Sequence, residues 1–599
     1  MPPKRKRTPK VKAKASPSPP PPPRPSAARS ASSRPARAPL TTDTDRSKRQ
    51  LRALAYIIIA AITSHTSVLS LSPVYGGTPS SLYHVQILSV LFVLAWFTQT
   101  LVLKSWKPPS YLLPIMAIYT PAVLRYSAQW SSKLGAVYGP IVTEAITLYP
   151  LFTLTILSAA SVALENSTNV FLDSILGIAP LGFFFHHLQA VLPGYIGPLI
   201  GSTWFLTRCG LWHAIGALFT LANLLSPSRL PSRHLTSILI SFLVPGLLYN
   251  SNQNTMCTLT PAINATLADY NHTLIARKES LTGYISVLDN TDINYRVLRC
   301  DHSLLGGEWQ QPPKGYSWPA DKDFREPVYA VFVIMEAVRL IDPPPKGDDN
   351  HNHKALAIGL GIGTSVDALI RHGIETDIVE LDPVVYEYAQ DYFFLSKNHT
   401  AYLEDATEFV ARETEKRVAR YDYVLHDVFT GGAVPAGLFT REFLMGLERM
   451  MADDGVIAIN WAGDLNALES QMVVRTMQSV FKGCRSFREY AEKAEGQKED
   501  EDFINMVTFC TTPRNPSTRL TFRAPRQEDL LNSLTRKQML MPKHEVDLDT
   551  IFAKSTNQGE VTLLTKANTG LLKKWQRNGA VGHWGLIRTV VPGRVWEEY

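Results

Sequence analysis

A series of long apolar stretches fills the first half of the chain, from about Leu51 to Leu248. Each stretch is close to the roughly 20 residues that an α-helix needs to cross a bilayer. We therefore expect a multi-span α-helical membrane domain with seven spans, and six or eight remain open. The expected spans are residues 51–72, 83–103, 110–129, 137–163, 174–194, 200–225 and 234–249.

Residues 1–50 differ from the rest of the chain in composition. They hold 14 Lys and Arg but two Asp, a local charge of +12 in a chain of net charge +7. This segment is rich in Pro, Ser and Ala and has little to bury, so we expect it to be disordered. The run KRKR favours a cytosolic flank attracted to anionic lipid over a nuclear signal or a nucleic-acid patch, and we expect no nucleic-acid partner. A mitochondrial transit peptide is another alternative, which the prolines oppose.

Strand-like and helix-like segments alternate from Ala355 onward. The strand-like runs are ALAIG, TDIVELD, YDYVLHDVF, GVIAINW and INMVTFC, and the helical segments lie near 365–372, 384–394, 407–417, 440–451 and 466–481. This alternation predicts a Rossmann-like, doubly wound α/β sheet with helices on both faces. The runs GYISVLDN and YRVLRCDHSLLGGEW before it predict a small N-terminal β subdomain.

A glycine-rich turn, Gly359, Gly361 and Gly363, follows the first strand of this alternation. In such a sheet the first strand-to-helix turn usually holds the ligand, because glycine lets the backbone approach closely and the helix start offers free N–H groups. Glu380 and Asp382 end the next strand about 20 residues on, where a carboxylate can accept hydrogen bonds from ribose hydroxyls.

Two further aspartates follow later strands. Asp405 is placed to accept a hydrogen bond from an adenine amino group. The turn reads Gly-x-Gly-x-Gly, and Glu380 and Asp405 account for one adenosine with no clear second nucleotide site. These features favour an S-adenosyl sulfonium cofactor over NAD. Asp427 ends the strand YDYVLHDVF, which is the fourth when a strand before Asp405 is counted. It faces the space above the cofactor and can accept a proton from an attacking amine. Holding the attacking amine and the cofactor together would supply much of the rate acceleration of the transfer.

The residues from about Gly283 to Cys510 resemble the spermidine synthase family of polyamine aminopropyltransferases. The motifs LLGG, REPVY, IGLGIG, VELD, EDATEF and YDYVLHDVF occur in the family's order, and the membrane spans add a likeness to membrane-fused members. The resemblance implies that Glu380 binds ribose, Asp405 binds adenine, Asp427 is the base and Tyr329 lines the polyamine pocket. It also implies aminopropyl transfer from decarboxylated S-adenosylmethionine to an amine.

The chain departs from the family pattern at three points. Ile362 replaces an acid in the glycine loop, Thr430 replaces a second acid after the base, and Ala330-Val331 follow Tyr329 in place of His-Glu. The missing acids would hold cationic amines, so their loss removes attraction for a polyamine.

Three functions follow from these observations. The first is a membrane-anchored aminopropyltransferase that uses decarboxylated S-adenosylmethionine on a small amine. The second is a methyltransferase that uses S-adenosylmethionine on a small or lipidic acceptor. The third is a transporter or sensor whose adenosyl-binding domain binds the cofactor without catalysing a reaction. The expected partners are the lipid bilayer, the small-molecule acceptor and, in a homodimer, a second copy of the chain.

The expected segments are the tail 1–50, the membrane domain 51–250, a linker 251–280, the small β subdomain with a helix 281–349, the adenosyl-cofactor domain 350–512 and a C-terminal extension 513–599. We assign the extension no function. The five cysteines show no metal-like or disulfide spacing, and two unrelated thiols are favoured over a Cys257–Cys300 bridge. We expect no metal.

The expected location is an endomembrane, with the N-terminal tail in the cytosol. Seven spans would place the second half in the lumen, and sequons at Asn264 and Asn271 agree. A cytosolic adenosyl cofactor favours an even number instead. Five ionisable residues fall inside the expected spans: Glu144, His186, His187, Arg208 and His213. We favour packing contacts for them over a transport path.

Overall fold

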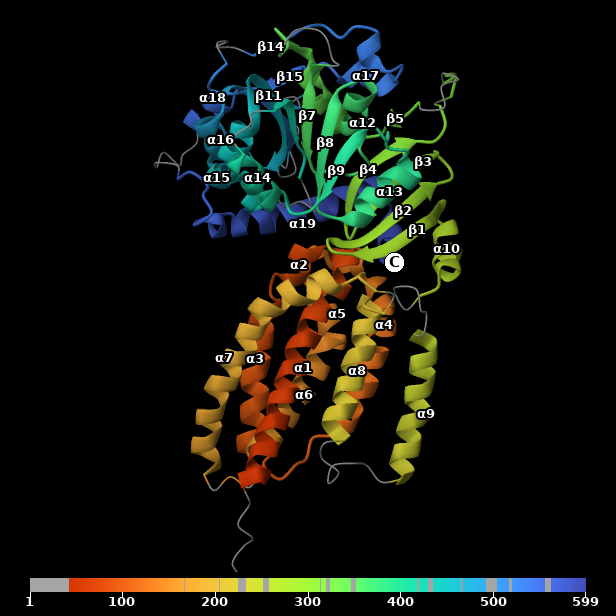
Figure 1. The fold of residues 1–599 in the computed structure, drawn as a ribbon. Coiled ribbons are helices and arrows are strands. Elements are labelled where there is room, and N and C mark those ends of the chain that lie inside the picture. Colours follow the sequence, from red (N-terminus) through yellow and green to blue (C-terminus); the bar gives the residue numbers. More distant parts are fainter. Residues whose placement is uncertain are drawn as a thin grey trace, which may run out of the picture. The chain divides into compact units, whose positions relative to one another are not determined.

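Helices give way to strands near residue 270, about ten residues before the start of the β subdomain that we expected at residue 281 (Figure 1). The computed structural model describes residues 43–165, 167, 169–203, 205–224, 233–250, 258–312, 314–318, 324–345, 352–416, 420–428, 435–463, 465, 467–491, 504–515, 520–554 and 562–599. The chain divides into two units, Met1–Ser47 and Lys48–Tyr599. The described part of the first unit is the start of a helix, whereas we had expected disorder up to residue 50; residues 1–42 lie outside the description.

Nine α-helices lie between residues 43 and 250 in the described part of the chain. They are α1 (Asp43–Tyr75), α2 (Gly77–Ser81), α3 (His84–Phe97), α4 (Leu113–Ala128), α5 (Ser131–Ile146), α6 (Leu148–Ala163), α7 (Val170–Ile196), α8 (Arg208–Leu224) and α9 (Arg233–Asn250). Their shared core includes Tyr56 of α1, Trp96 of α3, Phe152 of α6 and Trp212 of α8. These helices therefore pack as a bundle around apolar contacts.

Among the described residues, three helical segments are long and apolar enough to cross a membrane: Ser47–Tyr75, Gly77–Val102 and Val170–Leu199. The pair Ser131–Ile146 and Leu148–Ala163, bent by 47°, adds a fourth if it counts as one span. The seven spans that we expected are therefore not all found. Helices do form at the other three places.

Two of those helices are shorter than the sequence led us to expect. α4 has 16 residues and α8 has 17. The chain enters α4 through Pro108 and Pro109, which lack the N–H group that a helix interior needs. The residues before α8 form a turn in which Gly201 has φ +75°, a conformation that suits glycine. Apolar composition alone thus overestimated the lengths of these spans.

Five antiparallel strands form the small sheet, in the order β1-β2-β3-β4-β5. Their bounds are β1 (His272–Ser280), β2 (Gly283–Asn290), β3 (Tyr295–Cys300), β4 (Ser303–Trp309) and β5 (Glu326–Pro327). β1 and the helix α10 (Thr260–Ala268) fall within residues 251–280, which we expected to be a linker. Leu274 of β1 and Ile263 of α10 are buried in one apolar cluster, so these residues belong to the folded subdomain.

Eight strands form the main sheet, in the order β15-β12-β13-β11-β10-β7-β8-β9. β9, β8, β7, β10 and β11 run parallel, whereas β13, β12 and β15 are antiparallel additions. The bounds are β7 (Lys354–Ile358), β8 (Glu375–Glu380), β9 (His399–Leu403), β10 (Tyr421–His426), β11 (Met451–Gly463), β12 (Lys482–Arg488), β13 (Ile504–Thr511) and β15 (His544–Val546). The order reverses between β7 and β10, the point at which such sheets bind ligands.

Helices cover both faces of this sheet (Figure 1). One apolar cluster joins the strands to α14 (Ala406–Glu415), α15 (Arg441–Met450) and α16 (Leu468–Val480). A second joins the opposite side chains of the strands to α11 (Ala330–Met335) and α12 (Thr364–Arg371). The predicted Rossmann-like, doubly wound sheet is confirmed, and its arrangement is of the methyltransferase type.

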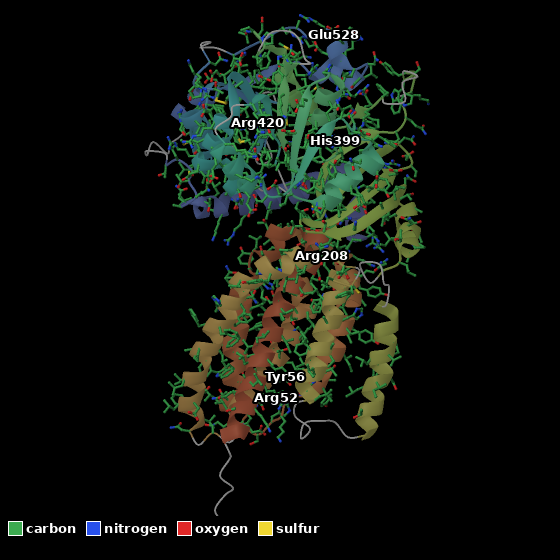
Figure 2. The ribbon with its side chains drawn as sticks, viewed as in Figure 1. Arg52, Tyr56, Arg208, His399, Arg420 and Glu528 are labelled. Atoms are coloured by element: carbon green, nitrogen blue, oxygen red, sulfur yellow. A yellow bond between two sulfur atoms is a disulfide. The ribbon has the colours of Figure 1, made fainter. Side chains whose placement is uncertain are left out.

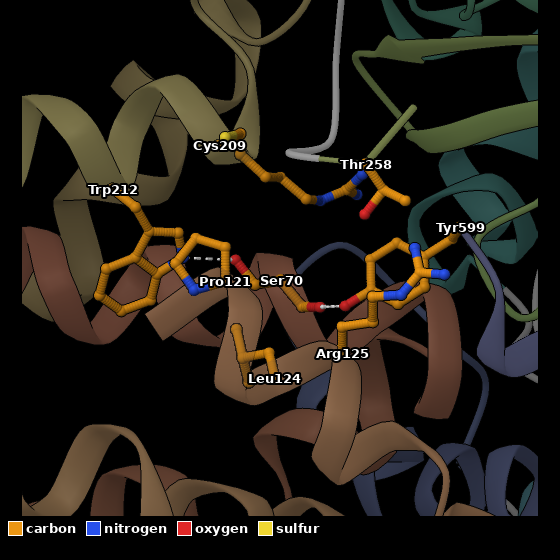
Figure 3. Close-up of a pocket in the computed structure, with 9 residues that line it drawn as sticks. Ser70, Pro121, Leu124, Arg125, Cys209, Trp212, Thr258 and Tyr599 are labelled. Carbon is orange, nitrogen blue, oxygen red and sulfur yellow. Dashed lines mark hydrogen bonds between the residues drawn. The ribbon is translucent and has the colours of Figure 1, made fainter. Parts of the chain in front are cut away.

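The C-terminal extension contains α17 (Leu534–Met539), α18 (Leu548–Lys554), α19 (Lys573–Val590) and α20 (Gly593–Glu597) as well as β15. It contacts the helical bundle: Trp584 donates from Nε1 to the carbonyl of Val74 over 3.0 Å, and Glu598 pairs with Arg125 at 2.9 Å. Figure 3 shows a small pocket at this contact, where Trp212 and Tyr599 both donate to Ser70. The extension thus ties the bundle to the α/β part.

The ionisable side chains of the bundle that we singled out are mostly engaged in contacts. Glu144 accepts hydrogen bonds from Ser67 and His84, each at 2.8 Å. Arg208, labelled in Figure 2, donates to Asp301 over 3.0 Å and so links α8 to the small sheet. These contacts fit the packing role that we favoured for both residues.

The structure differs from the sequence-based expectation for the cysteines. Cys484 of β12 and Cys510 of β13 form a disulfide, although nothing in their spacing predicted one. The two strands pair antiparallel, which brings residues 26 positions apart to neighbouring places. Cys300 is a free thiol, and the alternative partner Cys257 lies outside the described residues.

Candidate functional site

The glycine turn leaves β7 at the point where the strand order reverses. Gly359 has φ +86° and Gly361 φ +58°, values that favour glycine. A Cβ atom on Gly359 would lie 1.9 Å from the carbonyl oxygen of Asp427, and one on Gly361 would lie 2.4 Å from that of Leu305. Gly363 follows as the residue that precedes α12. The turn therefore needs glycine to fit between β10 and the small sheet.

Glu380 lies at the end of β8 and reaches the glycine turn. Its Oε2 accepts from the backbone N–H of Leu360 over 3.0 Å, and its Oε1 accepts from that of Asp382 over 2.8 Å. Burial raises the pKa of Glu380 to about 7, and the backbone hydrogen bonds oppose this shift. Each carboxylate oxygen keeps a second lone pair, so Glu380 can still accept from the ribose hydroxyls as we predicted.

Asp382 makes contacts that stabilise the fold around the end of β8. Its Oδ1 accepts from Ser280 Oγ over 2.6 Å and from Val384 N over 2.8 Å, and its Oδ2 accepts from Thr282 Oγ1 over 2.6 Å. It therefore caps α13 (Pro383–Phe393) and fixes the β1–β2 hairpin to that helix. The backbone N–H of Thr282 also donates to Oδ2 over 3.0 Å, so both oxygens of Asp382 are engaged within the protein, and its contact with the cofactor stays a prediction.

Asp405 begins α14 at an exposed position. Its Oδ1 accepts from the backbone N–H and from the hydroxyl of Thr407, each over 2.7 Å. An N-cap of this kind satisfies a free N–H group of the helix. No described residue donates to Oδ2, so contact with an adenine amino group stays a prediction for this residue.

Asp427 follows β10 beside the glycine turn. Asn460 of β11 donates from Nδ2 to Asp427 Oδ1 over 2.8 Å. Burial raises the pKa of Asp427 to about 6, and the hydrogen bond from Asn460 opposes this shift. A carboxylate with a pKa near neutrality is suited to accept a proton at physiological pH.

One pocket joins the glycine turn, the start of α12 and Asp427. It is lined by Leu305, Phe332, Gly359, Leu360, Ile362, Thr364, Ser365, Val366, Leu425 and Asp427. Tyr329 does not line it directly; its ring stacks edge-on against Phe332 at a centroid distance of 6.1 Å. The hydroxyl of Tyr329 is buried without a hydrogen bond among the described residues, and burial raises its pKa. Its acceptor-binding role stays a prediction.

Ile362, the residue that replaces an acid in the turn, is buried in an apolar cluster with Ile285 and Val385. A Cβ atom on Gly306 of β4 would lie 2.6 Å from its side chain. Ile362 therefore fastens the small sheet to the main domain. Thr430, the second departure, lies outside the described residues.

Asn460 is the site residue that sequence reasoning missed. It is the one polar side chain in the run GVIAINW, on the strand next to that of Asp427. An amide in an otherwise apolar parallel strand was the signal that could have identified it. Among the described residues, no group of three or more His, Cys, Asp and Glu side chains is arranged to hold a metal ion.

Part of the chain is similar to a known domain family. The spermine/spermidine synthase domain family matches residues 338–491. A polyamine aminopropyltransferase of Vibrio vulnificus is 33% identical over 114 residues, which cover 19% of this chain and 37% of that protein. A crystal structure of a probable spermidine synthase from Corynebacterium glutamicum is 16% identical, covers 48% of this chain and 98% of its own, and has a TM-score of 0.35.

A relative with a different activity covers nearly all of the chain. The N-terminal histidine N-methyltransferase of Emericella nidulans is 42% identical over 574 residues, which are 93% of this chain and 98% of that protein. The match therefore includes the helical bundle, the α/β domain and the C-terminal extension. The chain belongs to the same family as the N-terminal histidine N-methyltransferase of Emericella nidulans.

Proposed function

We propose that this protein transfers a methyl group from S-adenosylmethionine to a nitrogen of an N-terminal histidine. The full-length relative carries the proposal, because its name states this activity and its likeness spans the bundle and the α/β domain. The aminopropyl transfer that we first expected has less support. It rests on a domain match that covers residues 338–491.

The glycine turn supplies a second reason to prefer methyl transfer. A decarboxylated cofactor ends in an amine, and the acid that would hold it is replaced by Ile362, which is 1% exposed. An intact cofactor ends in an amino acid, whose carboxylate can be met by the free N–H groups at the start of α12 and by the hydroxyl of Thr364. No Lys or Arg lines the described pocket. The helix start would therefore hold the carboxylate.

The residues at the site have distinct tasks in this reaction. When bound, S-adenosylmethionine supplies a methyl group on a positively charged sulfur, and the sulfur–methyl bond breaks as the nitrogen–methyl bond forms. A neutral imidazole attacks with one nitrogen and becomes positively charged. Asp427 accepts the proton from the other nitrogen, which returns the ring to neutrality. Glu380 and the glycine turn hold the adenosine so that the methyl group faces the acceptor.

We further propose that the helical bundle lies in a lipid bilayer, in a multi-pass protein of an endomembrane with a cytosolic N-terminal tail. The outward face of α7 supports this, since little of this apolar helix is buried and Phe171, Leu176 and Phe183 are 62%, 62% and 76% exposed. Large exposed apolar surfaces need a partner, and lipid is the partner that long apolar helices suit. We do not propose transport, because Glu144 and Arg208 are engaged in contacts.

The test uses the full-length chain in detergent or nanodiscs with S-adenosylmethionine and two synthetic peptides. One begins with histidine, and the matched control carries one alanine before the same histidine. Mass spectrometry should find one added methyl group on the first peptide and none on the second. Absence of methylation, together with aminopropyl transfer from decarboxylated S-adenosylmethionine to a polyamine, would restore the alternative function.

A further inference from the structure

Asn460 places a side-chain amide directly beside the proposed base. β10 and β11 are parallel neighbours, with His426 paired to Ile459, so Asp427 and Asn460 follow as adjacent residues on adjacent strands. Asn460 is 5% exposed. A polar side chain at this depth needs hydrogen-bond partners for both ends of its amide.

One end of the amide has a partner and the other does not. Nδ2 donates to Asp427 Oδ1, and because a carboxylate oxygen can only accept, this contact fixes which end of the amide is the oxygen. Oδ1 of Asn460 is buried and accepts no hydrogen bond from the described residues. Leaving a buried acceptor unpaired is unfavourable, and a donor on a bound ligand would satisfy it.

Asp427 offers a second acceptor at the same place. Its Oδ1 is occupied by Asn460, whereas no described residue donates to Oδ2. Adjacent strands lie about 4.8 Å apart, so Asp427 Oδ2 and Asn460 Oδ1 can receive two donors from one small group. An N-terminal histidine presents two such donors, an imidazole N–H and the N–H groups of its α-amine.

We propose that Asn460 is a specificity-determining residue, whose Oδ1 accepts a hydrogen bond from the α-amine of the terminal histidine while Asp427 receives the imidazole proton. This inference rests on the proposed function and explains how the site tells a terminal histidine from an internal one. An amide oxygen accepts from the amine in either of its protonation states. In an internal histidine this nitrogen is an amide that carries the preceding residue, so it has one N–H group and a chain that must also fit beside the carboxyl ends of β10 and β11.

The test compares two peptides in three proteins. One peptide begins with histidine, and the other begins with des-aminohistidine, which keeps the imidazole but lacks the amine. The wild-type protein should prefer the first peptide in kcat/KM by about 10- to 100-fold, the range expected for one such hydrogen bond. N460L should lose this preference, because leucine has no acceptor, whereas N460D keeps an oxygen at this position and should retain it.

The pH dependence gives a second readout that a purely structural role would not move. Because the donor on Asn460 stabilises the ionised form of Asp427, N460L should shift the acidic limb of kcat/KM to higher pH. Equal preference for the first peptide in the wild-type protein and N460L would overturn the assignment of Asn460 and leave the proposed function intact. An absence of preference in the wild-type protein would overturn it too, without any variant having to fold. Methylation of neither peptide by the wild-type protein would overturn the proposed function and this inference together.

Discussion

Asn460 and Asp427 join the ends of two neighbouring strands through a hydrogen bond of 2.8 Å from Nδ2 to Oδ1. The carboxylate is thereby held in one orientation at the position where the sheet order reverses. The backbone carbonyl of Asp427 packs closely against Gly359, so the proposed base also contacts the glycine turn. Under the proposed function, this contact would link the position of the acceptor to that of the cofactor.

Asp427→Asn removes the proposed base with almost no change in shape. We expect kcat to fall by about 10²–10⁴-fold, the usual contribution of a general base, with the cofactor still bound. In the wild-type protein, activity should fall as the pH drops below about 6, where the carboxylate becomes protonated. Initial rates across this range, with calorimetric binding of S-adenosylmethionine as the control, test the assignment. A variant that keeps full activity would show that Asp427 is not the base.

Cofactor affinity should depend on pH through Glu380. Burial raises the pKa of its carboxyl group to about 7 in the free protein, and ribose hydroxyls donate only to the ionised form effectively. Binding therefore favours loss of the proton, so the dissociation constant should fall as pH rises through about 7. Glu380→Gln should bind about tenfold more weakly and show no such dependence. Glu375→Gln, at the exposed start of the same strand, is the matched control and should behave like the wild-type protein. A wild-type dissociation constant that is flat across this range would count against the ribose contact.

Gly359→Ala tests the tight fit of the cofactor turn. The added methyl group would lie 1.9 Å from the carbonyl oxygen of Asp427, at a residue with φ +86°. We expect a loss of stability of at least about 2 kcal/mol and loss of cofactor binding, because both the clash and the backbone conformation oppose alanine. Gly437→Ala has open space around its Cβ and should change little. Equal melting temperatures for the two variants would contradict the predicted geometry.

The sequence predicted the α/β domain well because its signals are local. Each expected helix between residues 365 and 481 occurs near its predicted bounds, and the glycine turn lies where the strand order reverses. Periodicity and turn chemistry decide such elements within about ten residues. β1 was missed because its run HTLIARKES mixes apolar and charged residues, and its burial depends on pairing with β2.

Contacts between distant residues were harder to predict. The sequence did not predict that the oxygens of Asp382 accept from Ser280 and Thr282, about 100 residues earlier. Asn460 reaches Asp427 only because β10 and β11 are neighbours in the sheet. The apolar helices of the bundle show the same limit, since hydropathy records composition but not where prolines and glycines end a helix.

The disulfide between Cys484 and Cys510 gives the last prediction. Alkylation of the denatured, unreduced protein should label Cys300 and leave these two cysteines unmodified until a reductant is added. Cys484→Ser should lower stability by about 2–4 kcal/mol, because the bond closes a loop in the unfolded chain, whereas Cys300→Ser should change it less. Labelling of all three cysteines before reduction would contradict the bond.

Structural disulfides persist in oxidising compartments, so an intact bond would place the α/β domain on the lumenal side. An odd number of spans would then be required, against the even number that a cytosolic cofactor favoured.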